Sequence, residues 1–147
     1  MDRSLAVDPN AAVSWALRGW ISVWAGEPES ATAEFEKAIR LSPFDPWISN
    51  YSSGMAFGLN TSRRFNEGLI WAFKSMQEDS HWAACHRQLV AALELTRRHA
   101  EAEVAARKHL TIEPGFTVRH WVETGPFRRT PGQERLFTAL RRAGLPD

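Results

Sequence analysis

The sequence has little of what an exported or membrane-embedded protein needs. Its single cysteine, Cys85, cannot form an internal disulfide, which agrees with a reducing compartment. No apolar run approaches the roughly 20 residues that cross a bilayer. The longest, GLIWAF, covers only residues 68–73, and the first residues, MDRSLAVDPN, lack the apolar core of an export signal. We therefore predict a cytoplasmic protein that makes no membrane contact.

A large charge of one sign is also absent. The formal net charge is +1, although residues 1–50 hold four Lys or Arg against seven Asp or Glu, and residues 115–147 hold six Arg against three acids. This gradient would allow an acidic partner to dock near Arg128, Arg129, Arg141 and Arg142, but a solvated basic face explains it as well. Because domains that bind nucleic acid through phosphates usually carry a stronger basic excess, we predict no nucleic-acid binding.

Catalytic motifs are missing too. The turn GEPESATAEF lacks the glycines and lysine of a phosphate-binding loop, and no nucleophile elbow or dinucleotide fingerprint occurs. His81 and Cys85 stand four residues apart with His86 beside them, yet zinc needs three or four protein ligands and no second pair has ligand spacing. A packed cysteine with surface histidines is the favoured interpretation. We predict no enzyme activity, no cofactor and no metal.

Helix-ending signals recur along the chain at a nearly constant interval. Pro9, Pro43 and Pro114 each follow an amphipathic run, and Ser80 stands at a similar helix end. The interval is 34 residues from 9 to 43, 37 from 43 to 80 and 34 from 80 to 114. A period of this length indicates helix pairs that stack on one another.

The first interval, which contains WALRGWISVWAGEPESATAEFEKAIRLSP, has a regular pattern of aromatic and small residues. Gly19 and Ala31 would let two antiparallel backbones approach closely while Trp15 and Phe35 fill the space beside them. We therefore expect a larger side chain at Ala31 to be among the most damaging changes. The predicted structural positions of all units are Trp15, Gly19, Ala31, Phe35, Ala38, Pro43, Gly68, Ala72, Ala102, Ala106 and Pro114.

Apolar periodicity and capping signals predict one helical domain over residues 1–147. Helices are expected at 11–25, 29–41, 45–60, 65–78, 82–96, 100–112 and 115–123, and a last one begins with Thr130 as N-cap and Gln133 completing a capping box. Residues 1–10 look like the end of a truncated repeat. Complete units follow at 12–45, 46–82 and 83–116, and residues 117–147 are predicted to be a capping helix pair. The open N-terminal end favours either a fragment of a longer protein or a covering second copy.

These units resemble tetratricopeptide repeats, with the fullest match in the first. The resemblance implies an all-α fold, a right-handed superhelix of antiparallel helix pairs. A narrower similarity, carried by LSPFDPWISNYSSGMAFGLNTSRRFNEGLIWAFKSM and the ending RRAGLPD, is to the C-terminal repeat region of bacterial proteins with an upstream class III adenylate or guanylate cyclase domain or winged-helix regulator domain. The catalytic residues of that family lie outside such regions, so none is transferred to this chain.

In tetratricopeptide proteins the first helix of each unit lines a concave groove that binds a peptide or helix of a partner. Here Ala16 and Trp20 replace residues of the carboxylate clamp that some members use, so chaperone-tail binding is not predicted. Trp20 and Trp24 lie about 140° and 180° around the helix from Trp15, so if Trp15 packs against its partner helix, the other two must face elsewhere. The predicted groove residues are Val13, Trp20, Trp24, Trp47, Asn50, Phe57, Arg87 and Glu94.

Two functions follow from this pattern. The first is a protein-interaction scaffold that binds a partner segment in the groove and forms the C-terminal docking or sensory part of a larger bacterial signalling protein. The alternative is a self-association module whose open N-terminal end forms a homodimer and holds upstream domains together. For Trp24 and Phe57, burial between neighbouring first helices is favoured over a place in the groove, because large aromatic side chains are usually buried.

Overall fold

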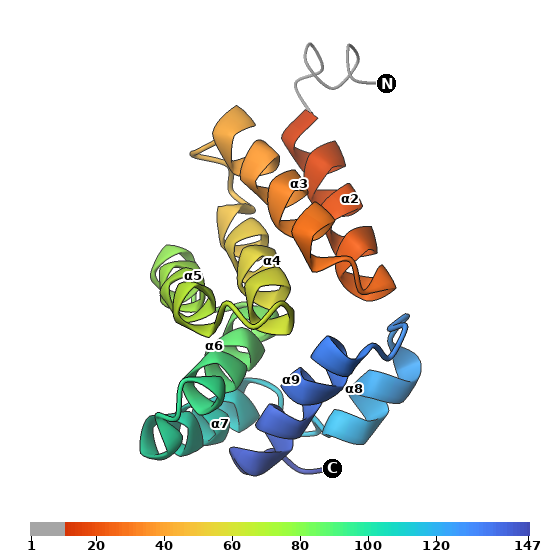
Figure 1. The fold of residues 1–147 in the computed structure, drawn as a ribbon. Coiled ribbons are helices and arrows are strands. Elements are labelled where there is room, and N and C mark those ends of the chain that lie inside the picture. Colours follow the sequence, from red (N-terminus) through yellow and green to blue (C-terminus); the bar gives the residue numbers. More distant parts are fainter. Residues whose placement is uncertain (1–10) are drawn as a thin grey trace.

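The computed structural model describes residues 11–147, and this part of the chain is entirely helical. Its helices are α2 (Ala11–Ala25), α3 (Pro28–Leu41), α4 (Ile48–Thr61), α5 (Phe65–Glu78), α6 (Ala83–Leu95), α7 (His99–Ile112), α8 (Val118–Thr124) and α9 (Pro131–Arg142). Figure 1 shows the pairs α2/α3, α4/α5 and α6/α7 stacked one below another. The truncated repeat predicted at residues 1–10 lies outside the described residues.

The helix ends follow from local chemistry. α3 begins with Pro28 in its first turn and stops shortly before Pro43, because proline suits a helix start and cannot continue a helix. The predicted capping box of α9 is confirmed: the Thr130 hydroxyl accepts from the Gln133 N–H, and the Gln133 side chain accepts from the Thr130 N–H. α4 begins at residue 48 and not at 45, because the Asp45 carboxylate accepts the Trp47 N–H and holds a turn.

Phe35 is the centre of the N-terminal core. Its side chain is fully buried on α3, and glycines of two neighbouring helices lie against the ring. A Cβ atom on Gly19 of α2 would lie 2.8 Å from the ring, and one on Gly54 of α4 would lie 2.2 Å from it. Only a residue without a side chain therefore lets both helices pack on Phe35. The predicted role of Gly19 is explained by this contact, whereas Gly54 was not among the predicted positions.

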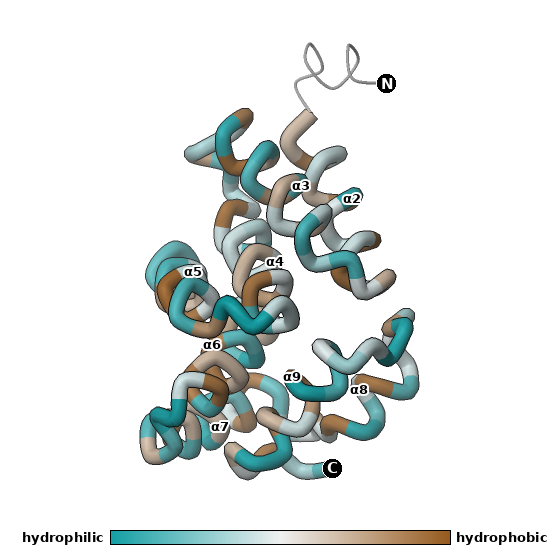
Figure 2. Tube along the Cα trace, viewed as in Figure 1, coloured by the Kyte–Doolittle hydropathy of each residue, from teal (hydrophilic) through white to brown (hydrophobic). Residues whose placement is uncertain are grey.

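The other structural positions have similar roles. Ala31, Ala38, Ala72, Ala102 and Ala106 are buried, and Pro43 and Pro114 are exposed just beyond the ends of α3 and α7. A Cβ atom on Gly68 would lie 2.1 Å from the Asn60 Oδ1, so this glycine lets α5 pack on α4. Trp15 is only half-buried, with the Arg18 guanidinium 4.5 Å above its ring centroid. Hydrophobic and hydrophilic positions alternate along the helices, as one-sided packing requires (Figure 2).

The last helix pair folds back toward the first. α9 packs on α6 and α4, which are the first helices of their units, and Leu136, Phe137 and Leu140 are its buried stripe. The N-terminal end of α9 is bonded to the C-terminal end of α2, because the Gln133 Nε2 donates to the Val23 carbonyl at 2.8 Å. Figure 1 shows the resulting curve, in which the segment before α9 lies next to the lower end of α2. Residues 117–147 therefore border the concave face of the stack.

Candidate functional site

A groove of about 520 Å³ lies on the concave face, between the first helices of the three units and the segment around α8. Its walls come from α2, α4 and α6, and Trp121 and Phe127 close it from the opposite side. The lining is mainly apolar and aromatic. It consists of Val13, Ala16, Leu17, Trp20, Trp24, Trp47, Asn50, Tyr51, Phe57, Ala84, Arg87, Gln88, Trp121 and Phe127.

Seven of the eight groove residues predicted from the sequence line this one space; they are Val13, Trp20, Trp24, Trp47, Asn50, Phe57 and Arg87. Glu94 does not, and that expectation is corrected. It lies on the α6 face of Arg87 but two turns later, where α9 packs on α6 and ends the groove. There the Glu94 carboxylate is bonded to the His99 ring at 2.9 Å.

Trp20 is held firmly in the centre of the groove wall. Its ring meets Phe35 edge-on with centroids 5.3 Å apart, and it meets Phe57 in the same way at 6.5 Å. The indole Nε1 donates to the Asn50 Oδ1 at 2.8 Å. Because its polar atom is already paired and its ring is packed on one side, Trp20 presents a preorganised apolar surface to the groove.

Phe57 is part of the groove floor and is not an accessible contact. Its side chain is only 2% exposed, and its ring stacks on Phe127 with centroids 6.0 Å apart. Trp121 lies 6.5 Å away and also meets the rings of Phe127 and Phe137. The sequence favoured burial of Phe57, and burial is what the structure shows. Its main partners, however, come from the C-terminal segment.

Among the described residues, Arg87 is the one cationic side chain that lines the groove, and it already has a partner. Its Nη1 lies 3.1 Å from the Glu113 carboxylate, and its guanidinium lies 5.1 Å from the centroid of Trp121. Burial lowers the pKa of Arg87, and the charge of Glu113 opposes that shift. A carboxylate ligand would have to compete with Glu113 for this group. The arrangement agrees with the absence of a carboxylate clamp in the sequence.

The rim of the groove carries a tryptophan pair. Trp47, which precedes α4, packs against Trp82, which precedes α6, with ring centroids 4.9 Å apart. Trp47 is half-exposed, so its free face is available to a ligand that leaves the groove here. Trp47 and Trp82 are the N-cap residues of the first helices of two successive units, so stacking of the units brings them together.

Several residues that line the groove were not predicted from the sequence. Leu17 follows Val13 by one helical turn, so its spacing was a usable signal. Trp121 and Phe127 carried no such signal, because their place depends on how the C-terminal segment folds back. Tyr51 lies against the groove as a neutral phenol; burial, followed by the charge of Asp45, raises its pKa to about 12.

His81 and Cys85, which the sequence offered as possible metal ligands, do not form a metal site. Cys85 is buried, and its Sγ lies 2.7 Å from the Ser75 hydroxyl and 3.1 Å from the Ser49 hydroxyl. Burial raises the pKa of the Cys85 thiol. His81 is exposed and pairs with Asp79 at 2.8 Å. Across residues 11–147 no group of three potential ligands is close enough to hold a metal ion.

Comparison with known proteins identifies the fold. No protein-family model matches the sequence, and no curated protein matches it. The crystal structure of MamA matches with a TM-score of 0.67 at 17% sequence identity, over 97% of this chain and 81% of the MamA chain. Within residues 11–147 no helix is sufficiently long and apolar to span a bilayer. Together with the helix pairs described above, this likeness shows that the chain has the fold of a tetratricopeptide-like helical solenoid, as the sequence predicted.

Proposed function

We propose that this chain is a non-enzymatic protein-interaction scaffold in the cytoplasm and that its concave groove binds a short segment of a partner protein. The observation that carries the proposal is the preorganised aromatic wall of a groove of about 520 Å³, in which Trp20 is fixed by Asn50. Aromatic side chains in partly desolvated depressions are the usual anchors of protein interfaces. The tetratricopeptide-like fold supports a protein as the ligand.

The chemistry of the groove specifies the kind of segment. Asn50 and Arg87 already have partners within the chain, so few polar groups of the groove are free to form hydrogen bonds or ion pairs with a ligand. Leu17 is 60% exposed and, with Val13, forms an apolar row beside Trp20. A segment that brings two or more large apolar side chains one helical turn apart would cover this row. We therefore infer recognition through apolar contacts and not through a charged terminus.

The biological setting is also a proposal. Similarity of LSPFDPWISNYSSGMAFGLNTSRRFNEGLIWAFKSM and RRAGLPD to repeat regions of bacterial cyclase-type and regulator proteins supports a docking or sensory part of a larger bacterial signalling protein. In such a protein, the groove would recruit the partner while a separate domain carries out the output. The measurement that addresses this point is the mass of the native protein in its source cells, detected with an antibody against this chain.

The groove can be tested without knowing the partner. A displayed library of random peptides, each about 12–16 residues long, would be selected against the chain, and the affinity of the winners measured by fluorescence anisotropy. We expect the selected peptides to share spaced apolar residues. Leu17→Glu should abolish their binding, whereas Val104→Glu, the same kind of change at a similarly exposed residue of α7, should leave it intact. Peptides that bind both variants equally would refute the groove as the binding site.

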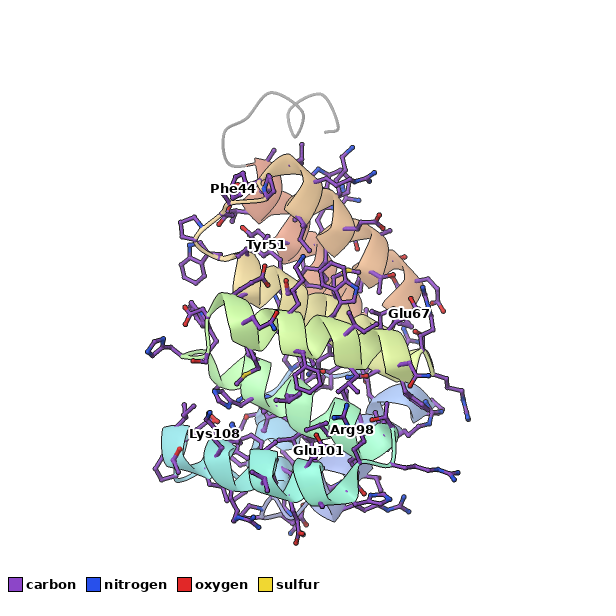
Figure 3. The ribbon with its side chains drawn as sticks, turned by 90° about the vertical axis from the view of Figure 1, so that its left-hand side faces the viewer. Phe44, Tyr51, Glu67, Arg98, Glu101 and Lys108 are labelled. Atoms are coloured by element: carbon purple, nitrogen blue, oxygen red, sulfur yellow. The ribbon has the colours of Figure 1, made fainter. Side chains whose placement is uncertain are left out.

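Self-association is supported by a different set of exposed residues. Ile21 on α2 is 60% exposed, and Phe44, in the turn after α3, is 95% exposed. Figure 3 shows Phe44 projecting at the N-terminal end of the stack. If two copies pair through this end, light scattering will give a dimer mass that Ile21→Glu or Phe44→Glu reduces to that of a monomer. Leu5 and Val7, which the sequence also places at this end, lie outside the described residues.

A further inference from the structure

A second cavity, separate from the groove, is surrounded by arginines. It measures about 460 Å³ and lies between α9 and the turns that connect α4 to α5 and α6 to α7. Arg63 comes from the first turn, Arg97 from the second, and Arg135 and Arg142 from α9. Three separate segments of the chain therefore each bring guanidinium groups to one place.

These four arginines have no counterion in the described part of the chain. None of them belongs to an ion pair within residues 11–147. Of the acidic residues that the structure describes, one lines the cavity: Glu94, whose carboxylate is bonded to the His99 ring. The Nη1 atom of Arg135 is buried and has no hydrogen-bond partner among the described residues. Burial, followed by the neighbouring charge of Arg63, lowers the pKa of Arg135, so these two guanidinium groups repel each other.

The surface just outside the cavity is neutralised. Arg64 and Arg98, the residues that follow Arg63 and Arg97, are each paired with a glutamate three residues later at 2.6 Å. Figure 3 shows Glu67 on α5 and the Arg98–Glu101 pair on α7. The two arginines directly beside Arg63 and Arg97 therefore do not extend the positive charge of the cavity along the surface. A compact anion fits this distribution better than an extended acidic chain does.

The backbone at Arg63 and Arg97 shows which substitutions the two turns can accept. Each is the residue before the N-cap of the following helix, and the equivalent residue in the first unit is Gly26. All three have a positive φ, at 65°, 64° and 74° respectively. Glycine suits this conformation and arginine does not. Arginine has the same conformation at Arg129, before the N-cap of α9, where it is paired with Glu134 and does not line the cavity, so the grouping of the arginines, and not the turn, indicates a ligand.

We infer that this cavity binds a small phosphate-bearing polyanion, held by the guanidinium groups of Arg63, Arg97, Arg135 and Arg142. Arginine presents paired N–H donors whose spacing matches the oxygens of a phosphate group. Two linked phosphates would contact α9 and both turns together. Binding would then connect the second and third units to the C-terminal helix and relieve the repulsion among the arginines. This site is independent of the proposed groove.

Sodium pyrophosphate is the probe, used in isothermal titration calorimetry at an ionic strength held constant with sodium chloride. We expect saturable binding and a raised thermal midpoint. Arg63→Gly and Arg97→Gly should each weaken binding about tenfold or more, because each removes charge-assisted hydrogen bonds. These variants keep the turn that Gly26 shows to be compatible with glycine, so loss of folding is not the cause. Arg107 is exposed on α7 and belongs to no ion pair in the described part of the chain, so Arg107→Gly supplies a charge-matched control, with folding of each variant checked by circular dichroism.

Other outcomes would overturn the inference. Binding that does not saturate, or that Arg107→Gly weakens as much as Arg63→Gly does, would reduce the effect to net charge. A hexaglutamate peptide that binds where pyrophosphate does not would make the cluster a docking site for an acidic protein. Leu17→Glu, which is expected to abolish peptide binding in the groove, should leave pyrophosphate binding unchanged. Failure of the anion site and failure of the groove are thus distinguishable.

Discussion

The indole Nε1 of Trp20 donates a 2.8 Å hydrogen bond to the side-chain oxygen of Asn50, which joins the first helices of two successive units. Both residues line the groove, so the bond fixes its wall as well as the interface between α2 and α4. Since a partly buried bond of this kind contributes about 0.5–1.5 kcal/mol, the two residues should be energetically coupled. We expect Trp20→Phe and Asn50→Ala to be non-additive in urea unfolding, with a coupling of about 1 kcal/mol. Additive effects would show that the bond does not stabilise the interface.

Gly54 should tolerate no side chain while Phe35 is present. The Cβ atom of Gly54→Ala would lie 2.2 Å from the Phe35 ring, so the variant should lose about 1–3 kcal/mol of unfolding free energy through overpacking. Gly115→Ala, where the added atom meets nothing within 4 Å, is the matched control. A smaller residue at 35 should partly rescue the variant, so Phe35→Leu combined with Gly54→Ala should be more stable than the sum of the single changes implies. The absence of rescue would place the strain elsewhere.

The repeat architecture could be predicted because its signals are local. Pro43, Gly26 and Thr130 act within a few residues of their own positions, and the helical period of the apolar residues defines which side of each helix is buried. The path of the C-terminal pair could not be predicted in the same way. It depends on the hydrogen bond from the Gln133 side chain to the carbonyl of Val23, across a sequence separation of 110. The residues near Gln133 give no signal that identifies this partner.

The groove residues likewise could be predicted where local spacing determines their position, and not where the fold-back of the C-terminal segment does. Trp20 and Asn50 were found because the outward faces of first helices follow from helical spacing and stacking. Trp121 was missed because it reaches the groove only through the fold-back, and Glu94 was misplaced because α9 covers its part of α6. Adjacent arginines also have different surroundings that the sequence does not distinguish. Arg141 is bonded to Asp147, whereas Arg142 lines the second cavity.

Gln133 should be the main polar link that closes the curve of the stack. Its Nε2 donates to the carbonyls of Val23 and Trp24, and its Oε1 accepts the N–H groups of Arg129 and Thr130. Gln133→Leu keeps most of the volume but leaves these buried groups unpaired, so we expect a loss of about 2–3 kcal/mol. Hydrogen exchange should accelerate in α9 more than in α3.

The same substitution at an exposed glutamine is the control for this link. Gln77 lies on α5 with its side chain exposed, and Gln77→Leu should change the unfolding free energy by less than about 0.5 kcal/mol. If Gln133→Leu is equally mild, the fold-back is maintained by the apolar stripe of α9 and the polar link is dispensable.

His109 should make the protein acid-sensitive. Its side chain is fully buried on α7, and neither ring nitrogen has a hydrogen-bond partner within residues 11–147. Burial, then the charges of Arg87 and His86, lowers its pKa from 6.5 to about 4, although the Glu113 carboxylate lies 3.8 Å from the Nε2. The unfolded chain therefore binds the proton more readily than the folded chain does. Its contribution to stability is complete above about pH 6.5 and is lost as the pH falls toward 4.

The expected size of this acid effect is about 3 kcal/mol at its limit, because each pKa unit corresponds to about 1.4 kcal/mol. Urea unfolding at several pH values between 7.5 and 4.5 would measure it. Carboxylates also titrate near the lower end of this pH range, so the wild type must be compared with His109→Leu. This variant should show a smaller change of unfolding free energy with pH between pH 6.5 and 5. His120→Leu removes an exposed histidine and should retain the slope of the wild type. Parallel slopes for all three proteins would mean that another group senses the acid, and His86, whose pKa burial also lowers, would be examined next.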